Sequence, residues 1–450
     1  MNSFSKKRVK GAKSVTDHRS EFEIDLDRLL FSTPVRRLAD KTQVFPLEKN
    51  DSVRNRLTHS MEVSNLARSI GNALVGNSSV FSEIDFPMRT IPPILATVGL
   101  MHDIGNPPFG HQGENAIRDW VNSNKVLHSI EHIDDFKNFE GNAQTFRLVT
   151  KLQLLDDHTG LDLTFCTLAA SVKYPVFSSG IDKTKPFRKK FNFFESERGR
   201  AEEVMKEVGQ KLGERHPLIF IVEACDDIAY SVFDVEDGVK KGIISYHDVI
   251  SYLSNKSNND TVINRLLDKC NSKYVKDLEE GLSPNELNDV SMQRFRAYAI
   301  SEMVNSTVSE YEKSFSSIKN YRYFKDLLNE SESAELVKLL KELASLHLFC
   351  HKSVLELELT GYNVIKYLMN CFWQSVSGRI KDPKGFEKTP FQNYCYSLIS
   401  ENYKRQLSRR KEGSDLSDEY IELQLAVDMV AGMTDSFAID LYEQLKRYNA

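Results

Sequence analysis

The sequence lacks the features of secreted and membrane proteins. No apolar run approaches the ~20 residues that a helix needs to cross a bilayer. The first residues are polar and continue into Lys6, Lys7, Arg8, Lys10 and Lys13, without the apolar stretch of a secretory leader. The six cysteines are scattered and form no C-x-x-C pair, so neither a disulfide framework nor a thiolate zinc site is indicated. We therefore expect a protein of the reducing cytoplasm that does not contact membranes.

Positive charge is also in short supply. The 450 residues include 59 Lys and Arg against 64 Asp and Glu, a formal net charge of −5. The molecule as a whole would repel a polyanion, so a phosphate site must be built from a few local cations or a metal ion. The basic segment within residues 1–25 is the exception. We interpret so short a run as a solvated, flexible tail, and the alternative is a nucleic-acid contact.

Signals for β-strands are sparse. There is no sustained apolar/polar alternation, and no Asn-Gly or Asp-Gly pair joins two such segments. Apolar residues instead recur with the 3.6-residue period of helices, and the apolar fraction of 40% supplies ample material for a core. The sequence therefore predicts an all-α fold.

Three segments of the first half carry the clearest helical stripes. The first covers residues 57–70 and includes Met61 in its apolar face. The second covers residues 92–105 and opens with two prolines in the first-turn positions, where proline is tolerated. The third covers residues 217–238.

The second half is predicted to consist of long amphipathic helices with few interruptions, at residues 287–318, 334–381 and 388–447. A polar stretch at residues 255–260 could end the first half. We expect three regions, namely the basic segment 1–25, a catalytic core at 26–255 and a helical C-terminal region at 256–450 that completes the site and forms oligomer contacts.

Two polar residues lie on otherwise apolar stripes, His102 in the second helix and Asp226 in the third. Buried ionisable groups are costly unless they are paired or bound to a metal. Together with His59 and Asp103 they would bring two imidazoles and two carboxylates into one place. Such a donor set suits Mn²⁺, Fe²⁺, Co²⁺ or Zn²⁺, and Mg²⁺ where oxygen and water ligands complete the shell.

The residue types alone leave this metal site open. A single histidine on a helix face is more often a hydrogen-bonded core residue than a ligand. His247 and Asp248 form a second His-Asp pair, which is as readily interpreted as an exposed helix start with Asp248 as a cap.

The surroundings of His102 distinguish the two pairs. Three ordered motifs contain the four candidate ligands: RLTHSMEV at Arg56–Val63, GLMHDIGNPPFGHQGE at Gly99–Glu114 and EACDDIAY at Glu223–Tyr230. Further segments belong to the same pattern: Phe31–Pro34, Arg36–Glu48, Phe139–Arg147, Lys173–Pro175 and Gly432–Ala438. The pattern resembles the bacterial deoxyguanosine triphosphate triphosphohydrolases of the HD superfamily, over most of residues 17–240 and in patches afterwards.

The resemblance implies an HD-domain helical core with a helical C-terminal region, and one divalent metal per site. By position, the ligands would be His59, His102, Asp103 and Asp226, with Mn²⁺ or Mg²⁺ favoured over Co²⁺, Fe²⁺ or Zn²⁺. Asp227 is the alternative to Asp226, but relatives often place Glu at this second acidic position, and Asp227 is as readily a carboxylate on the helix surface. We prefer Asp226 since it shares the stripe of Leu218 and Val222.

The same resemblance implies a catalytic pair, His111 and Glu114. Their separation of three residues would put both on one side of the first turn of a helix that begins near Gln112, within reach of a shared water. The alternative role of Glu114 is that of a capping carboxylate.

Substrate contacts are implied for a further set of residues. Arg56 could donate two N–H groups to a phosphate, and Lys173 beside Tyr174 offers a point charge. Tyr230, Asp234 and Gln43 would lie near the sugar, although Tyr230 could equally be interior packing and Asp234 a solvated acid. Glu358 and Lys404 are weaker candidates for base recognition.

The activity implied is attack of a metal-activated water on the α-phosphorus of dGTP, or of other dNTPs, giving a deoxynucleoside and tripolyphosphate. The alternatives are an HD hydrolase of another phosphate ester and a non-catalytic regulatory protein that binds dNTP or single-stranded DNA. The resemblance also implies a homo-oligomer, with a hexamer favoured, and single-stranded DNA as a candidate effector.

Overall fold

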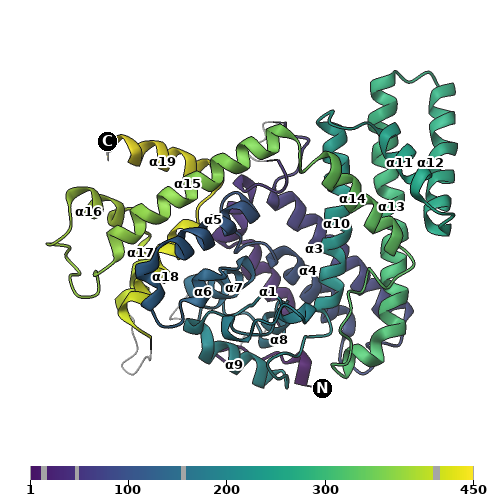
Figure 1. The fold of residues 1–450 in the computed structure, drawn as a ribbon. Helices are drawn as coiled ribbons and strands as arrows, with labels where there is room; N and C mark the ends of the chain where they lie inside the picture. The colour runs from purple at the N-terminus through teal and green to yellow at the C-terminus, as the bar shows by residue number, and fades with distance from the viewer. Residues whose placement is uncertain (1, 12–17, 46–49, 154–158, 409–415, 449–450) are drawn as a thin grey trace.

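The fold is built from helices and short turns, as a computed structural model shows (Figure 1). The structure describes residues 2–11, 18–45, 50–153, 159–408 and 416–448. Within these ranges the only extended pairings are two isolated bridges, Thr42 with Asn55 and Phe177 with Phe193. The predicted all-α class is confirmed.

The helices of the first half are α1 Glu21–Leu30, α2 Thr33–Arg37, α3 Arg56–Asn77, α4 Ile91–Met101, α5 Gly110–Ser123, α6 Asp134–Lys137, α7 Gly141–Arg147, α8 Phe165–Ala170, α9 Arg198–Glu207, α10 Ile219–Lys240 and α11 Tyr246–Lys256. Those that follow are α12 Thr261–Glu279, α13 Pro284–Lys319, α14 Ala334–His347, α15 Lys352–Val376, α16 Pro390–Ser397, α17 Glu401–Ser408, α18 Asp418–Ala431 and α19 Asp435–Tyr448. No described helix is long and apolar enough to span a bilayer.

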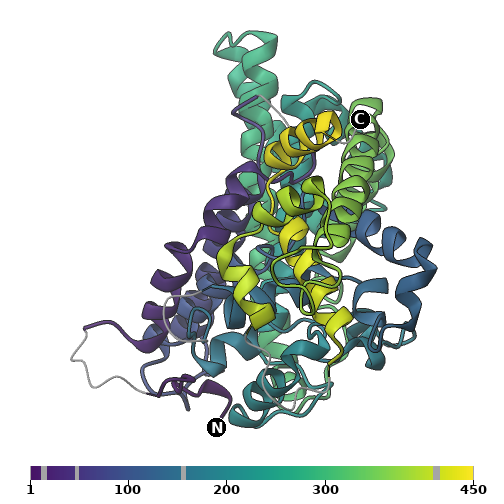
Figure 2. The same cartoon turned by 90° about the vertical axis from the view of Figure 1, so that its left-hand side faces the viewer.

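Helices α3, α4 and α10 form the centre of the molecule and correspond to the three predicted stripes (Figures 1 and 2). Helix α3 begins at a capping box in which the Asn55 side chain accepts from the Thr58 N–H. Met61 was predicted to face the core but is 53% exposed. Helix α4 ends at Met101 rather than near Gly105, because the chain continues in tight turns such as Ile104 N–H to Met101 O.

One hydrophobic cluster joins the two halves of the chain, and it extends from Phe22 to Leu445. Helix α13 packs on α10, and α15 packs along α5. Helix α15 lies so close that a Cβ at Gly361 would come within 2.3 Å of the Phe109 ring. The C-terminal helices therefore share the core that carries the first half.

Two of the predicted long helices are interrupted. The segment 334–381 is two helices, because the chain turns at Leu348–His351 between α14 and α15. The segment 388–447 contains four helices, with Thr389 and Ser417 accepting N-terminal N–H groups as caps. Periodicity did not reveal these breaks, since the apolar face resumes with the same spacing after each turn.

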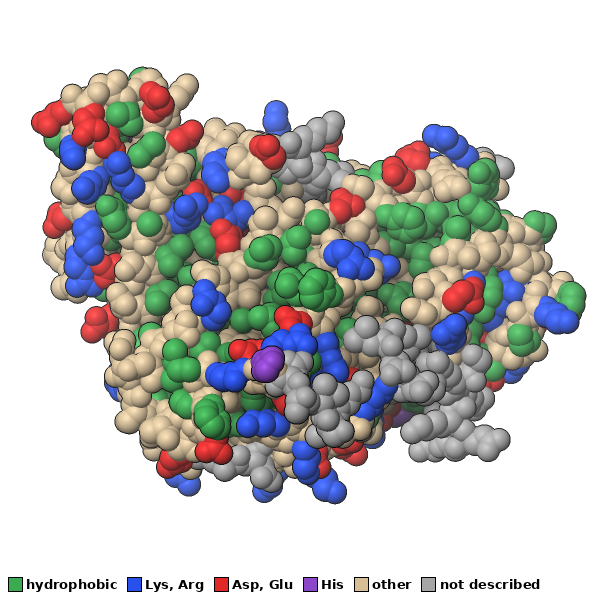
Figure 3. Space-filling view, turned by 180° about the vertical axis from the view of Figure 1, so that it is seen from behind, with side chains coloured by type: hydrophobic (Ala, Val, Ile, Leu, Met, Phe, Trp, Pro, Cys, Tyr) green, Lys and Arg blue, Asp and Glu red, His purple; other side chains and the backbone are tan. Residues whose placement is uncertain are grey.

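Helices α11 and α12 and the first part of α13 project from the body (Figure 1). Both signs of charge are interspersed over this projection (Figure 3), and its cations pair with neighbouring acids, as Arg265 does with Glu302. The face seen in Figure 3 therefore carries both signs of charge.

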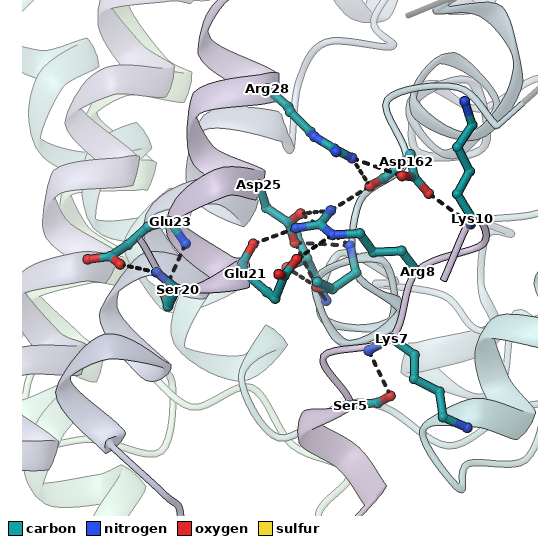
Figure 4. Close-up of polar contacts among 12 residues, drawn as sticks. Ser5, Lys7, Arg8, Lys10, Ser20, Glu21, Glu23, Asp25, Arg28 and Asp162 are labelled. Atoms are coloured by element: carbon teal, nitrogen blue, oxygen red, sulfur yellow. Dashed lines mark hydrogen bonds and ion pairs between the residues drawn. The ribbon is translucent and has the colours of Figure 1, made fainter. Parts of the chain in front are cut away.

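Within the described part of the basic N-terminal segment, Lys6, Lys7 and Lys10 are exposed, whereas Arg8 is packed against α1 and not solvated as expected. Arg8 is 6% exposed and forms ion pairs with Glu21 and Asp25, both at 2.6 Å (Figure 4). The Phe4 ring lies edge-on to His216, with centroids 5.4 Å apart. Composition alone did not reveal the position of Arg8, because its partners Glu21 and Asp25 come from α1 and are brought to it by the fold. Lys13 lies outside the described residues, as do positions 46–48 of the Arg36–Glu48 motif.

Candidate metal and phosphate site

Helices α3, α4 and α10 bring His59, His102 and Asp226 together. The Asp226 Oδ1 atom lies 3.2 Å from His59 Nε2 and 3.5 Å from His102 Nε2. Each residue offers one ligand atom, and these atoms all lie within 4.8 Å of one another. Two imidazole nitrogens and a carboxylate oxygen form a donor set for a divalent transition ion.

The environment of His102 fits a metal ligand. Its Nδ1 lies 2.7 Å from the Gly99 carbonyl, which fixes the tautomer with the proton on Nδ1 and the lone pair on Nε2. Nε2 is buried and makes no hydrogen bond among the described residues. A buried nitrogen lone pair that faces a carboxylate and a second imidazole is the arrangement that a cation completes.

Without a cation, His102 and the carboxylates beside it shift one another's pKa values. Burial alone would lower the pKa of His102, but Asp103 and Asp226 raise it to about 10. Burial alone would raise the pKa of Asp226, but His102 and His59 lower it well below its usual value. A bound metal would take the place of the imidazolium proton.

Asp103 lies beside the cluster, with Oδ2 3.4 Å from His102 Nε2. The same oxygen is ion-paired with the Arg56 guanidinium, and Oδ1 accepts a hydrogen bond from Asn106. Arg56 also donates from Nε to the Thr42 carbonyl at 3.0 Å. Arg56, which is expected to bind phosphate, is therefore ion-paired with Asp103, which is expected to bind the metal.

Asp226 and Asp227 point to different partners. Asp227 accepts from Lys341 of α14 at 2.6 Å, and it is not part of the three-residue cluster. Burial raises the pKa of Asp227 to about 6, against the lowering effect of Lys341. This arrangement agrees with the preference for Asp226 as the ligand.

His111 and Glu114 lie on the first turn of α5, which begins at Gly110. His111 Nδ1 is 3.2 Å from Glu114 Oε2, and the His111 side chain is 85% exposed whereas that of Glu114 is 3% exposed. Glu114 Oε1 also accepts from the Gly141 N–H at 2.7 Å, at the start of α7. Glu114 is therefore both the partner of His111 and an acceptor at the N-terminus of another helix.

A second carboxylate and two cations surround Glu114. The Arg118 Nη2 atom lies 3.3 Å from both Glu114 and Glu140, and Lys190 Nζ is 2.9 Å from Glu140. Burial alone would raise the pKa of Glu114, but the His111 hydrogen bond and the charges of Lys190 and Arg118 lower it. Burial and the charge of Glu114 raise the pKa of Glu140.

Lys173 and Tyr174 lie close to the metal cluster. Lys173 Nζ is 3.6 Å from Glu223 and 5.9 Å from the centre of the Tyr174 ring. Burial alone would lower the pKa of Lys173, but Glu223, Tyr174 and Asp226 raise it. A charged ammonium is thereby retained beside Asp226.

Two residues that are expected to lie near the sugar have buried polar atoms without a partner among the described residues. Asp234 Oδ2 and Gln43 Oε1 are buried and accept no hydrogen bond within the described ranges. Burial raises the pKa of Asp234 well above its usual value, so the alternative of a solvated acid is wrong. The Tyr230 ring packs on Phe349 with centroids 5.7 Å apart.

The two weaker candidates differ in position. Glu358 of α15 accepts from Gln112 at 3.3 Å, next to His111 in α5. Lys404 pairs with Glu401 and lies 4.9 Å from the Tyr396 ring centre, in the α16–α17 region. Only Glu358 is thus brought to the expected catalytic pair. Asp248 forms a capping box with Ser245 at the start of α11, as its alternative interpretation predicted.

The sequence interpretation overlooked Asp435, although it lies in a motif of the resemblance. Asp435 accepts from the Thr42 N–H at 2.9 Å, from the Thr42 hydroxyl and from the Phe109 N–H at 3.0 Å. Lys41 donates to the Ala431 carbonyl at 3.1 Å in the same region. The C-terminal motif therefore anchors both the segment before Gln43 and the start of α5.

Glu140 was also overlooked despite lying in a quoted motif, because only its buried contact with Arg118 reveals its connection to Glu114. Lys190 carried no signal at all, since it belongs to no motif and reaches the site only through the fold.

Comparison with known proteins agrees with this geometry. The HD domain family model matches residues 56–166, which contain His59, His102 and Asp103. A deoxyguanosinetriphosphate triphosphohydrolase-like protein of Listeria monocytogenes is 37% identical over 447 residues, covering 96% of this chain and 94% of that protein. A protein of the same description from Synechocystis is 34% identical, covering 98% of each chain. The deoxyguanosinetriphosphate triphosphohydrolase of Serratia proteamaculans is 29% identical, covering 94% of this chain and 93% of its own. The chain therefore belongs to the deoxyguanosinetriphosphate triphosphohydrolase-like family of HD-domain proteins.

Proposed function

We propose that the protein hydrolyses dGTP, or a closely related dNTP, to a deoxynucleoside and inorganic tripolyphosphate, using one divalent ion such as Mn²⁺ or Mg²⁺. The observation that carries this proposal is the convergence of His59, His102 and Asp226 around the buried Nε2 of His102, which has no hydrogen-bond partner among the described residues. The His111–Glu114 pair at the start of α5 supports it. The names of the relatives support the substrate class.

The side chains divide the work by position. A divalent ion held by His59, His102 and Asp226, with Asp103 beside them, would lower the pKa of a water and neutralise charge on the α-phosphate. His111, held by Glu114, would donate a proton to the departing 5′-oxygen or accept one from the attacking water.

Recognition of the substrate is assigned to three sets of residues. Lys173 and Arg56 would bind the phosphates. Asp234 and Gln43, each with a buried atom that lacks a hydrogen bond among the described residues, would bind the sugar hydroxyl. Tyr230 would pack against the sugar.

Product analysis tests the proposal. With dGTP and Mn²⁺, we expect deoxyguanosine and tripolyphosphate in equal amounts. Formation of dGMP with pyrophosphate, or of dGDP with orthophosphate, would contradict attack at the α-phosphorus with loss of the whole triphosphate. A panel of the four dNTPs in the same assay determines base preference.

The same assay in EDTA separates an enzyme from a regulatory binding protein. Loss of tripolyphosphate release in EDTA and its return with added Mn²⁺ would support metal-dependent hydrolysis. Nucleotide binding without any product in Mn²⁺ would instead favour a sensor. The homo-oligomer and the single-stranded DNA effector stay predictions, to be tested by sedimentation and by salt-dependent DNA binding.

A further inference from the structure

Glu223 connects two cations at the edge of the site. It lies on α10, three residues before Asp226. Its Oε1 atom is 3.6 Å from Lys173 Nζ, and its Oε2 atom contacts Arg215 Nη2 directly. The carboxylate therefore bridges the ammonium of Lys173 and the guanidinium of Arg215.

Arg215 fixes the position of this carboxylate. Arg215 is 4% exposed, and its guanidinium lies against an edge-to-face pair of rings, 3.9 Å from the centre of Phe187 and 4.4 Å from that of Phe220. Its Nε and Nη1 atoms have no hydrogen-bond partner among the described residues, so Glu223 is its one bonded acceptor there. A buried guanidinium that contacts two aromatic rings and a carboxylate has little freedom to move.

Lys173 is held differently. Its ammonium makes an ion pair with Glu223 at 3.6 Å, beyond hydrogen-bond distance, and no hydrogen bond from Nζ is present in the described part of the chain. Glu223 thus attracts the ammonium electrostatically, but none of its three N–H groups is used in a hydrogen bond to that carboxylate. They remain able to donate to phosphate oxygens.

The charges of the three residues also favour a polyanion. Lys173 and Arg215 contribute two positive charges and Glu223 one negative charge, so the trio is net positive although it contains an acid. Without Arg215, Glu223 would cancel Lys173. Replacing a buried ion pair by apolar residues is often neutral or stabilising, so stability alone gives weak reason for an arginine in this place.

We propose that Glu223 is a positioning residue that holds the Lys173 ammonium for a β- or γ-phosphate, and that Arg215 is the counter-ion that leaves this arrangement net positive. This inference rests on the proposed function, because it assumes that Lys173 faces the triphosphate. The direction in which polyphosphate affinity changes when Glu223 loses its charge distinguishes this role from simple competition. If Glu223 merely competed with phosphate for Lys173, removing its charge would strengthen polyphosphate binding, whereas a positioning role requires that binding weaken.

The test uses Glu223→Gln, which keeps the shape of the side chain and removes its charge. Inorganic tripolyphosphate is titrated calorimetrically into the Mn²⁺-loaded full-length protein, and kcat and KM for dGTP are measured separately. We expect tripolyphosphate affinity to fall about tenfold and KM to rise by a similar factor, with kcat changed less than about twofold. Glu223→Asp, which keeps the charge, should recover part of the affinity.

Two further variants exclude a general effect. Glu203→Gln removes the same charge from a surface pair with Arg200 and should bind tripolyphosphate like the wild type. In a Lys173→Gln background, Glu223→Gln should cause no further loss, because the group that it positions is gone. Thermal unfolding of each variant reports whether the fold is retained.

The outcomes distinguish this inference from the proposed function. Unchanged or tighter tripolyphosphate binding by Glu223→Gln would overturn the positioning role, even if the wild type releases tripolyphosphate from dGTP. The same holds if the loss persists undiminished in the Lys173→Gln background. If the wild type releases no tripolyphosphate from any dNTP, but Glu223→Gln still weakens tripolyphosphate binding through Lys173, the proposed activity fails and the positioning role stands.

Discussion

The imidazole of His111 is exposed to solvent, whereas the carboxylate that orients it is buried. Glu114 is fixed from three directions, by His111, by Arg118 and by the Gly141 N–H. Gly141 permits this approach, because a Cβ there would lie 3.1 Å from Glu114 Oε1 and 2.1 Å from Asn106 Oδ1. An exposed imidazole held by a fixed carboxylate is suited to general acid–base catalysis.

At the residue scale we therefore predict that His111→Ala removes most turnover and leaves metal binding intact. The loss should be about 10²- to 10⁴-fold in kcat, the usual contribution of a general acid or base. Tripolyphosphate release gives the rate, and calorimetric titration with Mn²⁺ gives the metal affinity.

His247→Ala is the matched control, since His247 belongs to the second His-Asp pair and bonds to Tyr274 at the exposed start of α11. It should turn over at the wild-type rate. Equal losses in the two variants, or loss of Mn²⁺ binding in His111→Ala, would contradict the assignment.

Single residues show where sequence reasoning succeeds and where it stops. His102 and Asp226 could be singled out because a polar residue on an apolar stripe is conspicuous. The pairing of Asp227 with Lys341 could not be predicted, since 114 residues separate the partners and no pattern connects them. The Gly141 contact of Glu114 was likewise hidden, because it depends on the placement of α7 against α5.

At the scale of elements, the start of α19 controls the start of α5. Asp435 is 2% exposed, and its two oxygens accept from Thr42 and Phe109. Phe109 itself has a left-handed backbone, with φ of 61°, immediately before the helix that carries His111. The orientation of the catalytic pair thus depends on a helix that is distant in sequence.

We predict that Asp435→Asn lowers both stability and turnover. An amide nitrogen would face donors that now bond to a carboxylate, and a buried donor without an acceptor costs about 1–3 kcal/mol. The free energy of unfolding from urea titration and kcat for dGTP measure the two effects. Asp440→Asn, at an exposed position of the same helix, should change neither. A fully active and stable Asp435→Asn protein would show that α5 does not need this anchor.

The helices α3, α4 and α10 themselves were largely predictable, because all three have clear periodicity, while α3 also begins at a capping residue and α4 at first-turn prolines. The C-terminal breaks were not. The turn between α14 and α15 contains no glycine or proline, so only the packing of the two helices determines that the chain bends there.

At the scale of the whole molecule, a buried histidine makes stability depend on pH. His216 donates from Nε2 to the Ser3 carbonyl at 2.9 Å and accepts from the Leu218 N–H at 3.3 Å, which requires the neutral ring. Burial lowers its pKa from 6.5 to about 4. Below pH 6.5 the unfolded chain takes up a proton that the folded protein does not, so stability falls as the pH decreases toward 4.

We predict that this histidine alone costs the folded state about 3 kcal/mol between pH 6.5 and pH 4. His216→Gln, whose amide can still donate to Ser3, should lack this component. The difference in unfolding free energy between wild type and variant, measured across that range, isolates it from carboxyls such as Asp135, whose pKa burial raises to about 6. A difference that does not change with pH would contradict the buried neutral state of His216.

The hydrogen bonds that Asp435 accepts from Thr42 and Phe109 can form only late in the synthesis of the chain. Translation reaches Asp435 326 residues after Phe109, whose amide it binds. A chain still emerging from the ribosome has the start of α5 and the Thr42 segment without their acceptor until residue 435 has been synthesised. A product that stops before Asp435 should therefore leave the N–H groups of Thr42 and Phe109 unanchored, and the start of the helix that carries His111 without its hold on α19.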